Sequence, residues 1–184
     1  AYKNFGSETI RYRGPIVYSG STPDYVLTPE GMVLNVNGRW VRQYNLTDHL
    51  GNTRAVVEGT SGTIQQTDYY PFGTAFNVAN TNKNKYLYGG KEYQDEVVGG
   101  TLFGMADFEA RFADFRIPRF TSIDPLAEKR FSISPYAYCS NNPLNRIDPT
   151  GMLDDEWEYV VNINQLEKVG NKGGEETHFV TAVV

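Results

Sequence analysis

Short alternations of hydrophobic and polar residues run through most of the chain, with turn-forming residues between them. PIVYSG (15–20), DYVLTPEG (24–31) and TRAVVE (53–58) have the length and period of strands that bury one face. In GMVLNVNGRWVRQY, Asn37-Gly38 lies between two alternating runs, which is the strongest short sequence signal for a hairpin. The pattern therefore predicts an antiparallel architecture of hairpins and meanders.

Four later segments need a separate interpretation. The polar stretch 77–85 (NVANTNKNK) predicts a loop, and 126–131 (LAEKRF), which follows a proline, predicts one helical turn. The aromatic-rich stretch 101–120 is compatible with two strands, but its spacing also permits a helix. Residues 156–184 alternate again and predict a three-stranded meander.

The composition agrees with a mostly β protein. Hydrophobic residues make up 40% of the chain and charged residues 21%, which are ordinary globular values. Aromatic residues make up 14%, and their rings pack well on pleated surfaces. The 18 glycines indicate many turns. We therefore expect a mostly β fold with short helical turns.

Charge and cysteine content exclude several classes of function. The net charge of −5 argues against nucleic acid as a partner, because phosphate binding requires clustered cations. The single cysteine, Cys139, excludes an intrachain disulfide and a cysteine-rich zinc site. No apolar run approaches the roughly 20 residues that span a bilayer. We expect no metal and no cofactor, and the abrupt ends suggest a segment of a longer protein.

Candidate nucleophiles and bases are few. His49 falls in an expected turn and His178 in an expected strand, far apart in the sequence, and no G-x-S-x-G nucleophile motif is present. Cys139 is interpreted as a small buried residue.

Two aspartates share one local sequence. Asp124 occurs in SIDPLAEK and Asp148 in RIDPTGM, each within Ile-Asp-Pro. One interpretation is a pair of similar turns, because Asp bonds to the backbone ahead of it and Pro fixes φ. The other is a carboxylate pair, in which one group acts as base and the other as acid to activate water.

Five ordered segments together resemble the Rhs repeat-associated core domain, of the kind common in Bacteroidetes-like chains. The resemblance covers about residues 40–152 and rests on YNLTDHLGNTRAVV, TDYYPFG, YLYGGKEY, FEARFADFRIPRFTSIDPLAEK and SPYAYCSNNPLNRIDPTG. It implies a β-hairpin spiral shell that encloses a variable C-terminal effector, with the core closing one end. In well-matched members the core is an aspartyl autoprotease that cuts just after a D-P-x-G motif.

The resemblance also assigns residues. It makes Asp124 and Asp148 the catalytic pair and Arg111, in EARFADF, the residue that orients or charge-stabilises them. Pro149 and Gly151 belong to the motif turn. The cut would follow Met152, where the family usually has leucine, and would leave Leu153 as a new N-terminus.

The implied organisation has three parts. Residues 1–39 would end the preceding shell, 40–152 would form the core, and 153–184 would begin the variable, pre-toxin segment. The partners would be the C-terminal effector and the shell repeats, and exposed strand edges would also allow a homodimer. The full-length protein would be secreted or on the bacterial cell surface.

A second interpretation is a structural or adhesive surface module that binds a glycan or a protein and does not cut itself. Two departures from the family pattern favour it. ADFRIPRF replaces Y-D-P-x-x-G-R-F, and DPLA lacks the glycine of D-P-x-G.

Overall fold

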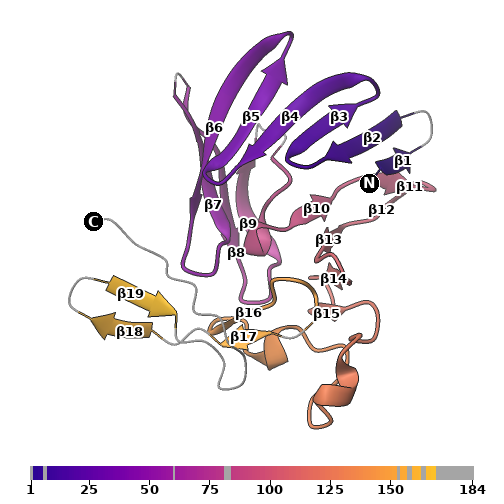
Figure 1. Cartoon of the computed structure of the whole chain (residues 1–184), viewed down its shortest axis with the longest axis vertical. Coiled ribbons are helices and arrows are strands. Elements are labelled where there is room, and N and C mark those ends of the chain that lie inside the picture. Colours follow the sequence, from indigo (N-terminus) through magenta and orange to yellow (C-terminus); the bar gives the residue numbers. More distant parts are fainter. Residues whose placement is uncertain are drawn as a thin grey trace.

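The described part of the chain forms antiparallel β structure with three short 3-10 turns, which confirms the predicted fold class (Figure 1). This computed structural model describes residues 2–5, 8–59, 61–80, 84–152, 154–156, 159–162 and 165–168.

The N-terminal half forms one nine-stranded sheet in which every strand pairs with the next along the chain. Figure 1 shows this meander curving across the upper part of the molecule. Its strands are β1 (Tyr2–Phe5), β2 (Glu8–Arg13), β3 (Ile16–Ser19), β4 (Thr22–Thr28), β5 (Gly31–Val36), β6 (Arg39–Thr47), β7 (Thr53–Glu58), β8 (Gly62–Tyr69) and β9 (Ala75–Asn80).

The β5–β6 hairpin turns at Asn37 and Gly38, as the sequence predicts. Both residues have positive φ, 53° and 83°, which is the conformation that a two-residue hairpin turn requires. The Gly38 amide also donates a hydrogen bond to Asn35 Oδ1 at 2.9 Å. The boundary predicted at residues 39 and 40 falls at the start of β6 and stays a prediction.

Two expectations about secondary structure were wrong. The loop expected at 77–85 is contradicted at 77–80, which belong to β9, and β9 pairs only with β8 among the described strands. Residues 84–85 are not in a strand, and 81–83 lie outside the described residues. An edge strand can carry polar residues, because much of its surface faces water. The aromatic stretch 101–120 contains neither a helix nor just two strands. It holds four short strands, interrupted by positive φ at Gly104 and Glu109.

Those four strands belong to two small sheets. β11 (Val97–Val98) and β12 (Thr101–Leu102) form a separate hairpin. The order of the other sheet is β10 (Glu92–Gln94), β13 (Met105–Asp107), β14 (Phe112–Asp114) and β15 (Arg119–Phe120). Short helical turns precede and follow this sheet at η1 (Tyr88–Gly90), η2 (Ala127–Lys129) and η3 (Cys139–Asn141), and η2 confirms the turn predicted after Pro125.

An aromatic core fixes the four-stranded sheet in place. Phe108 packs edge-to-face on Phe115, Phe120 and Tyr138, with ring centroids 5.5–6.3 Å apart. The core also holds Cys139. Its other buried members are Tyr88, Ala106 and Ala113.

The η1 segment joins this core to the nine-stranded sheet. The Thr53 amide donates to the Leu87 carbonyl at 2.9 Å, and the Gly89 amide donates to Asn52 Oδ1 at 2.7 Å. Tyr88 Oη donates to the Pro71 carbonyl at 2.6 Å. The core is therefore anchored to the strands β7 and β8 by backbone as well as side-chain bonds.

The last described strands form two small pairs. β16 (Arg146–Ile147) pairs with β17 (Asp155–Glu156), and β18 (Tyr159–Asn162) pairs with β19 (Gln165–Lys168). The third strand predicted for the C-terminal meander, at 176–184, and His178 lie outside the described residues.

Candidate functional site

Asp148 organises the loop that follows β16. Its Oδ1 atom accepts backbone hydrogen bonds from Thr150 (3.2 Å), Gly151 (2.6 Å) and Met152 (3.1 Å). The Pro149 carbonyl accepts a bond from Lys91 Nζ at 2.5 Å. The Asp-Pro turn expected from the sequence is present, and its acid is buried, with 1% of the side chain exposed.

Gly151 is the residue that lets this loop approach the core. Its φ is +71°, and a Cβ placed there would lie 2.7 Å from the Phe108 carbonyl oxygen and 3.1 Å from the Arg111 amide nitrogen. A side chain at this position would therefore push the loop away from Arg111.

Asp124 forms a second turn between β15 and η2. Its Oδ1 accepts the Leu126 amide at 2.8 Å, and its own amide donates to the Pro135 carbonyl at 3.0 Å. Its side chain is 13% exposed, so solvent reaches it more readily than it reaches Asp148.

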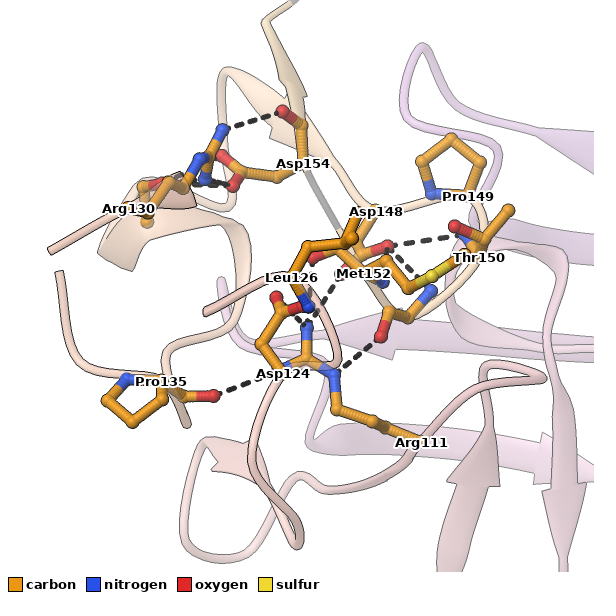
Figure 2. Close-up of polar contacts among 12 residues, drawn as sticks. Arg111, Asp124, Leu126, Arg130, Pro135, Asp148, Pro149, Thr150, Met152 and Asp154 are labelled. Atoms are coloured by element: carbon orange, nitrogen blue, oxygen red, sulfur yellow. Dashed lines mark hydrogen bonds and ion pairs between the residues drawn. The ribbon is translucent and has the colours of Figure 1, made fainter. Parts of the chain in front are cut away.

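Arg111, immediately before β14, brings the two acids together (Figure 2). Its Nη2 lies 2.9 Å from Asp124 Oδ2 and 3.4 Å from Asp148 Oδ2. The same Nη2 donates to the Met152 carbonyl oxygen at 3.0 Å. Asp124 and Asp148, which are 24 residues apart in the sequence, therefore contact the same guanidinium nitrogen as the carbonyl oxygen of Met152, the residue before Leu153.

Further contacts fix the guanidinium in one orientation. Nε donates to the Gly151 carbonyl at 2.5 Å and Nη1 to the Pro135 carbonyl at 3.0 Å. The guanidinium carbon lies 3.7 Å from the centroid of the Phe120 ring. Sequence reasoning did not find Phe120 or Pro135, because a stacking ring and a backbone carbonyl have no motif of their own.

Burial changes the protonation of this cluster. It raises the pKa of the Asp148 carboxyl above its usual value, although the backbone bonds from Met152 and Gly151 and the charge of Arg111 act in the opposite direction. It also lowers the pKa of Arg111, against the effect of both acids. Asp148 therefore holds a proton at a higher pH than a free aspartate does.

The remaining candidates lie elsewhere. Leu153 falls outside the described residues. Cys139 is buried in the aromatic core, where burial raises the pKa of its thiol to about 12, so it is not a thiolate nucleophile at neutral pH. His49 lies in the turn after β6.

Two features are absent from the described residues. They contain no group of three or more His, Cys, Asp or Glu placed to hold a metal ion. Within that same part of the chain, no helix is long and apolar enough to cross a membrane.

Known proteins resemble this chain in sequence or in fold. No protein-family model matches the chain. Salivary gland surface protein 1 of Aedes aegypti is 32% identical over 116 residues, which are 61% of this chain but only 3% of that protein.

Solved toxin structures are similar over most of the chain. A TcdB2-TccC3-TEV structure covers 82% of it, with a TM-score of 0.59 and 18% identity. The Photorhabdus luminescens Tc holotoxin pore, with an Asp-to-Ala mutation in TccC3, covers 90%, with a TM-score of 0.57 and 18% identity. TcdB2-TccC3 without its hypervariable C-terminal region covers 79%, with a TM-score of 0.55 and 19% identity.

In each case this chain matches 8% of the toxin chain. At these identities the likeness establishes a shared fold. The chain thus has the β fold of a small part of much longer toxin chains.

Proposed function

We propose that this chain is the core of an Rhs-type β-shell and that it cuts its own backbone after Met152. The observation that carries the proposal is the bond from Arg111 Nη2 to the Met152 carbonyl oxygen. That carbonyl belongs to the peptide at which the sequence resemblance places the cut. Its oxygen contacts the same Arg111 nitrogen as the carboxylates of Asp124 and Asp148.

The proposed reaction is hydrolysis by a carboxylate pair. Asp124, the more exposed acid, takes a proton from a water molecule, and the water oxygen attacks the carbonyl carbon of Met152. Negative charge develops on the carbonyl oxygen, where Arg111 Nη2 already donates a hydrogen bond. The guanidinium thus stabilises the tetrahedral intermediate.

Asp148 completes the reaction as the acid. Because burial favours its protonated form, it can donate a proton to the Leu153 nitrogen as the Met152–Leu153 bond breaks. The products are a Met152 carboxyl group and a Leu153 amine. The substrate is the enzyme's own chain, so each molecule reacts once.

The biological setting is part of the proposal. One of the similar toxin structures is described as lacking a hypervariable C-terminal region. This supports a role in which residues 153–184 begin a variable effector segment and the core closes the shell around it. The shell repeats and the effector would be the protein partners, and the full-length protein would be secreted or on the cell surface.

Intact mass during incubation of the 184-residue chain tests the cleavage. We expect the parent to lose its last 32 residues and to yield a new N-terminus at Leu153, while Asp148→Asn stays whole. Asp114→Asn is the matched control. Asp114 is also a poorly exposed acid paired with an arginine, at 2.7 Å from Arg116 Nη2, but it lies outside the cluster. A parent chain that keeps its full mass would overturn the proposal.

One observation favours the alternative of a non-cleaving adhesive module. Trp40 and Tyr44 lie on the same face of β6 and are 51% and 40% exposed. Exposed aromatic residues of this kind can stack on a sugar or a partner protein. Persistent full-length mass together with loss of glycan or protein binding on Trp40→Ala would support this function.

A further inference from the structure

A second buried charge cluster lies next to the proposed cleavage site and surrounds Asp154. The Asp154 side chain is only 5% exposed. Arg130 Nη1 pairs with its Oδ1, and Arg146 Nη1 lies 2.9 Å from its Oδ2 (Figure 2 shows the Arg130 pair). Ser140 Oγ donates to the same carboxylate, at 2.9 Å from Oδ2. We call Arg130, Ser140 and Arg146 the Asp154 clasp.

The clasp is built from three separate segments. Arg130 follows η2 as its C-cap, Ser140 lies in η3 and Arg146 begins β16. Arg130 also donates from Nη2 to the Asp154 backbone carbonyl at 3.1 Å, and from Nη1 to Ser140 Oγ at 2.9 Å. A carboxylate leaves water at high cost unless it is paired, and these groups satisfy both of its oxygens.

The backbone under the clasp is strained. Cys139, Ser140 and Asn141 have φ values of 47°, 50° and 60°, three left-handed residues in succession that are not glycine. Left-handed backbone is unfavourable for residues with a side chain, least so for Asn, and a run of it has to be held by the surrounding structure. The run places Ser140 Oγ against the Asp154 carboxylate.

Asp154 is the second residue after the proposed scissile bond. Met152 is held on one side of Leu153 by Arg111, through its carbonyl oxygen. Asp154 is held on the other side by the clasp, and β17 then pairs with β16. The backbone is therefore fixed on both sides of the peptide bond to be cut.

We propose that the Asp154 clasp is a binding subsite for the second residue after the scissile bond, and that it retains the C-terminal segment after cleavage. It positions the Met152–Leu153 peptide against Arg111, Asp124 and Asp148. It recognises an acidic side chain at one position of an otherwise variable segment. The inference rests on the proposed self-cleavage, but whether the clasp holds Asp154 in place can be measured on a chain that does not cut itself.

Hydrogen exchange on the uncut chain tests whether the clasp holds Asp154 in place. In an Asp148→Asn background, we expect adding Asp154→Asn to speed exchange in peptides spanning 152–160 by about ten-fold or more, because charged hydrogen bonds are lost. Peptides from the β5–β6 hairpin should not change, which excludes global unfolding. Exchange at 152–160 that is unaffected by Asp154→Asn would overturn the clasp.

Arg146 offers a conservative pair of variants. Arg146 is 23% exposed, so it tolerates replacement more readily than a fully buried residue. Arg146→Gln should loosen 152–160, whereas Arg146→Lys, which keeps the charge, should retain most of the protection. Asp95→Asn is the control for Asp154→Asn, because it removes the same charge from an acid that is 53% exposed and pairs with Lys85 away from the clasp. Equal effects of the two Arg146 variants would contradict recognition by charge.

The cleaving chain tests the positioning and the retention. Asp154→Asn should slow self-cleavage by about ten-fold, and its C-terminal fragment should separate on size exclusion. The parent fragment should co-elute with the core, and Asp95→Asn should behave as the parent does. If the parent chain never cuts itself, the proposed function is wrong, and the exchange experiment alone decides whether the clasp holds Asp154. Unchanged rate and retention in Asp154→Asn would overturn the subsite.

Discussion

At the scale of single residues, the cluster depends on how differently the two acids are placed. Asp148 directs one oxygen at three backbone amides and has almost no contact with solvent. Asp124 is 13% exposed and uses one amide bond on the corresponding oxygen. Two Ile-Asp-Pro turns that look alike in sequence therefore produce two carboxylates in unlike surroundings, which is what separate acid and base roles require.

The raised pKa of Asp148 sets the expected pH dependence. Asp148 can no longer donate its proton once the pH rises through that pKa. The rate of the proposed cleavage should therefore fall as the pH is raised from about 4 to about 8. The folded chain also binds this proton more tightly than the unfolded chain, so this group's contribution to stability falls over the same rise in pH. Intact mass and urea denaturation measure the two effects. A cleavage rate that rises throughout the series would contradict Asp148 as the acid.

Gly151 provides a test of the close approach between the loop and the core. Gly62 has the same φ of +71° but nothing within 4 Å of an added Cβ, so Gly62→Ala measures backbone strain alone, about 1–2 kcal/mol. Gly151→Ala should lose about 1–3 kcal/mol more, because its methyl group overlaps Phe108. It should also stop cleavage. Urea denaturation of both variants decides this, and equal losses would mean that the loop can move away freely.

At the scale of elements, the site is carried by short strands that owe their order to the aromatic core. β13, β14 and β15 have only two or three residues each, too few to hold a sheet by backbone bonds alone. Phe108 packs against Phe115 and Phe120. Phe120, in β15, packs in turn against Tyr138 and also underlies Arg111. The core and the site therefore share a residue.

Phe108→Ala should show this dependence. Phe108 is 1% exposed, and removing its ring should lower the free energy of unfolding by about 3–5 kcal/mol. Phe131→Ala is the matched control, because Phe131 is 92% exposed and should change stability by no more than about 0.5 kcal/mol. Denaturation midpoints that are the same for the two variants would show that the ring cluster does not hold the strands.

Local chemistry explains which elements the sequence could predict. Asn37-Gly38 determines its own hairpin, and the alternating runs around it determine which face is buried. The β9 strand was missed because its polar residues resemble a loop, and only pairing with β8 makes them a strand. The four strands of 101–120 were missed for a related reason, since each is too short to show a period.

The candidate site was predictable in part. The Asp-Pro repeats and the family resemblance pointed to Arg111, Asp124 and Asp148, and the structure brings these three side chains together. Their contact with the Met152 carbonyl involves a backbone atom, which no residue pattern records. Asp154 gave no signal either, because its partners come from segments 8 to 24 residues away.

At the scale of the whole molecule, the sheet and the core serve different purposes. The nine strands follow one another without a crossover and form a simple meander. Beyond β9 the chain first passes beside the sheet, where Lys3 Nζ of β1 lies 3.2 Å from Glu92 Oε1 of β10. It then leads to the lower part of the molecule in Figure 1 and carries every residue of the proposed site.

The geometry of the site predicts that the proposed cleavage takes place within one molecule. The Met152 carbonyl is already bound by the same chain's Arg111, so the effective concentration of the substrate peptide is far above any that mixing could supply. The cleavage half-time should therefore stay constant over about a 100-fold range of protein concentration. A tagged Asp148→Asn chain mixed with the parent should remain uncut. Cleavage of the tagged chain, or a half-time that shortens with concentration, would mean that one molecule acts on another and that the bound Met152 carbonyl is not the substrate.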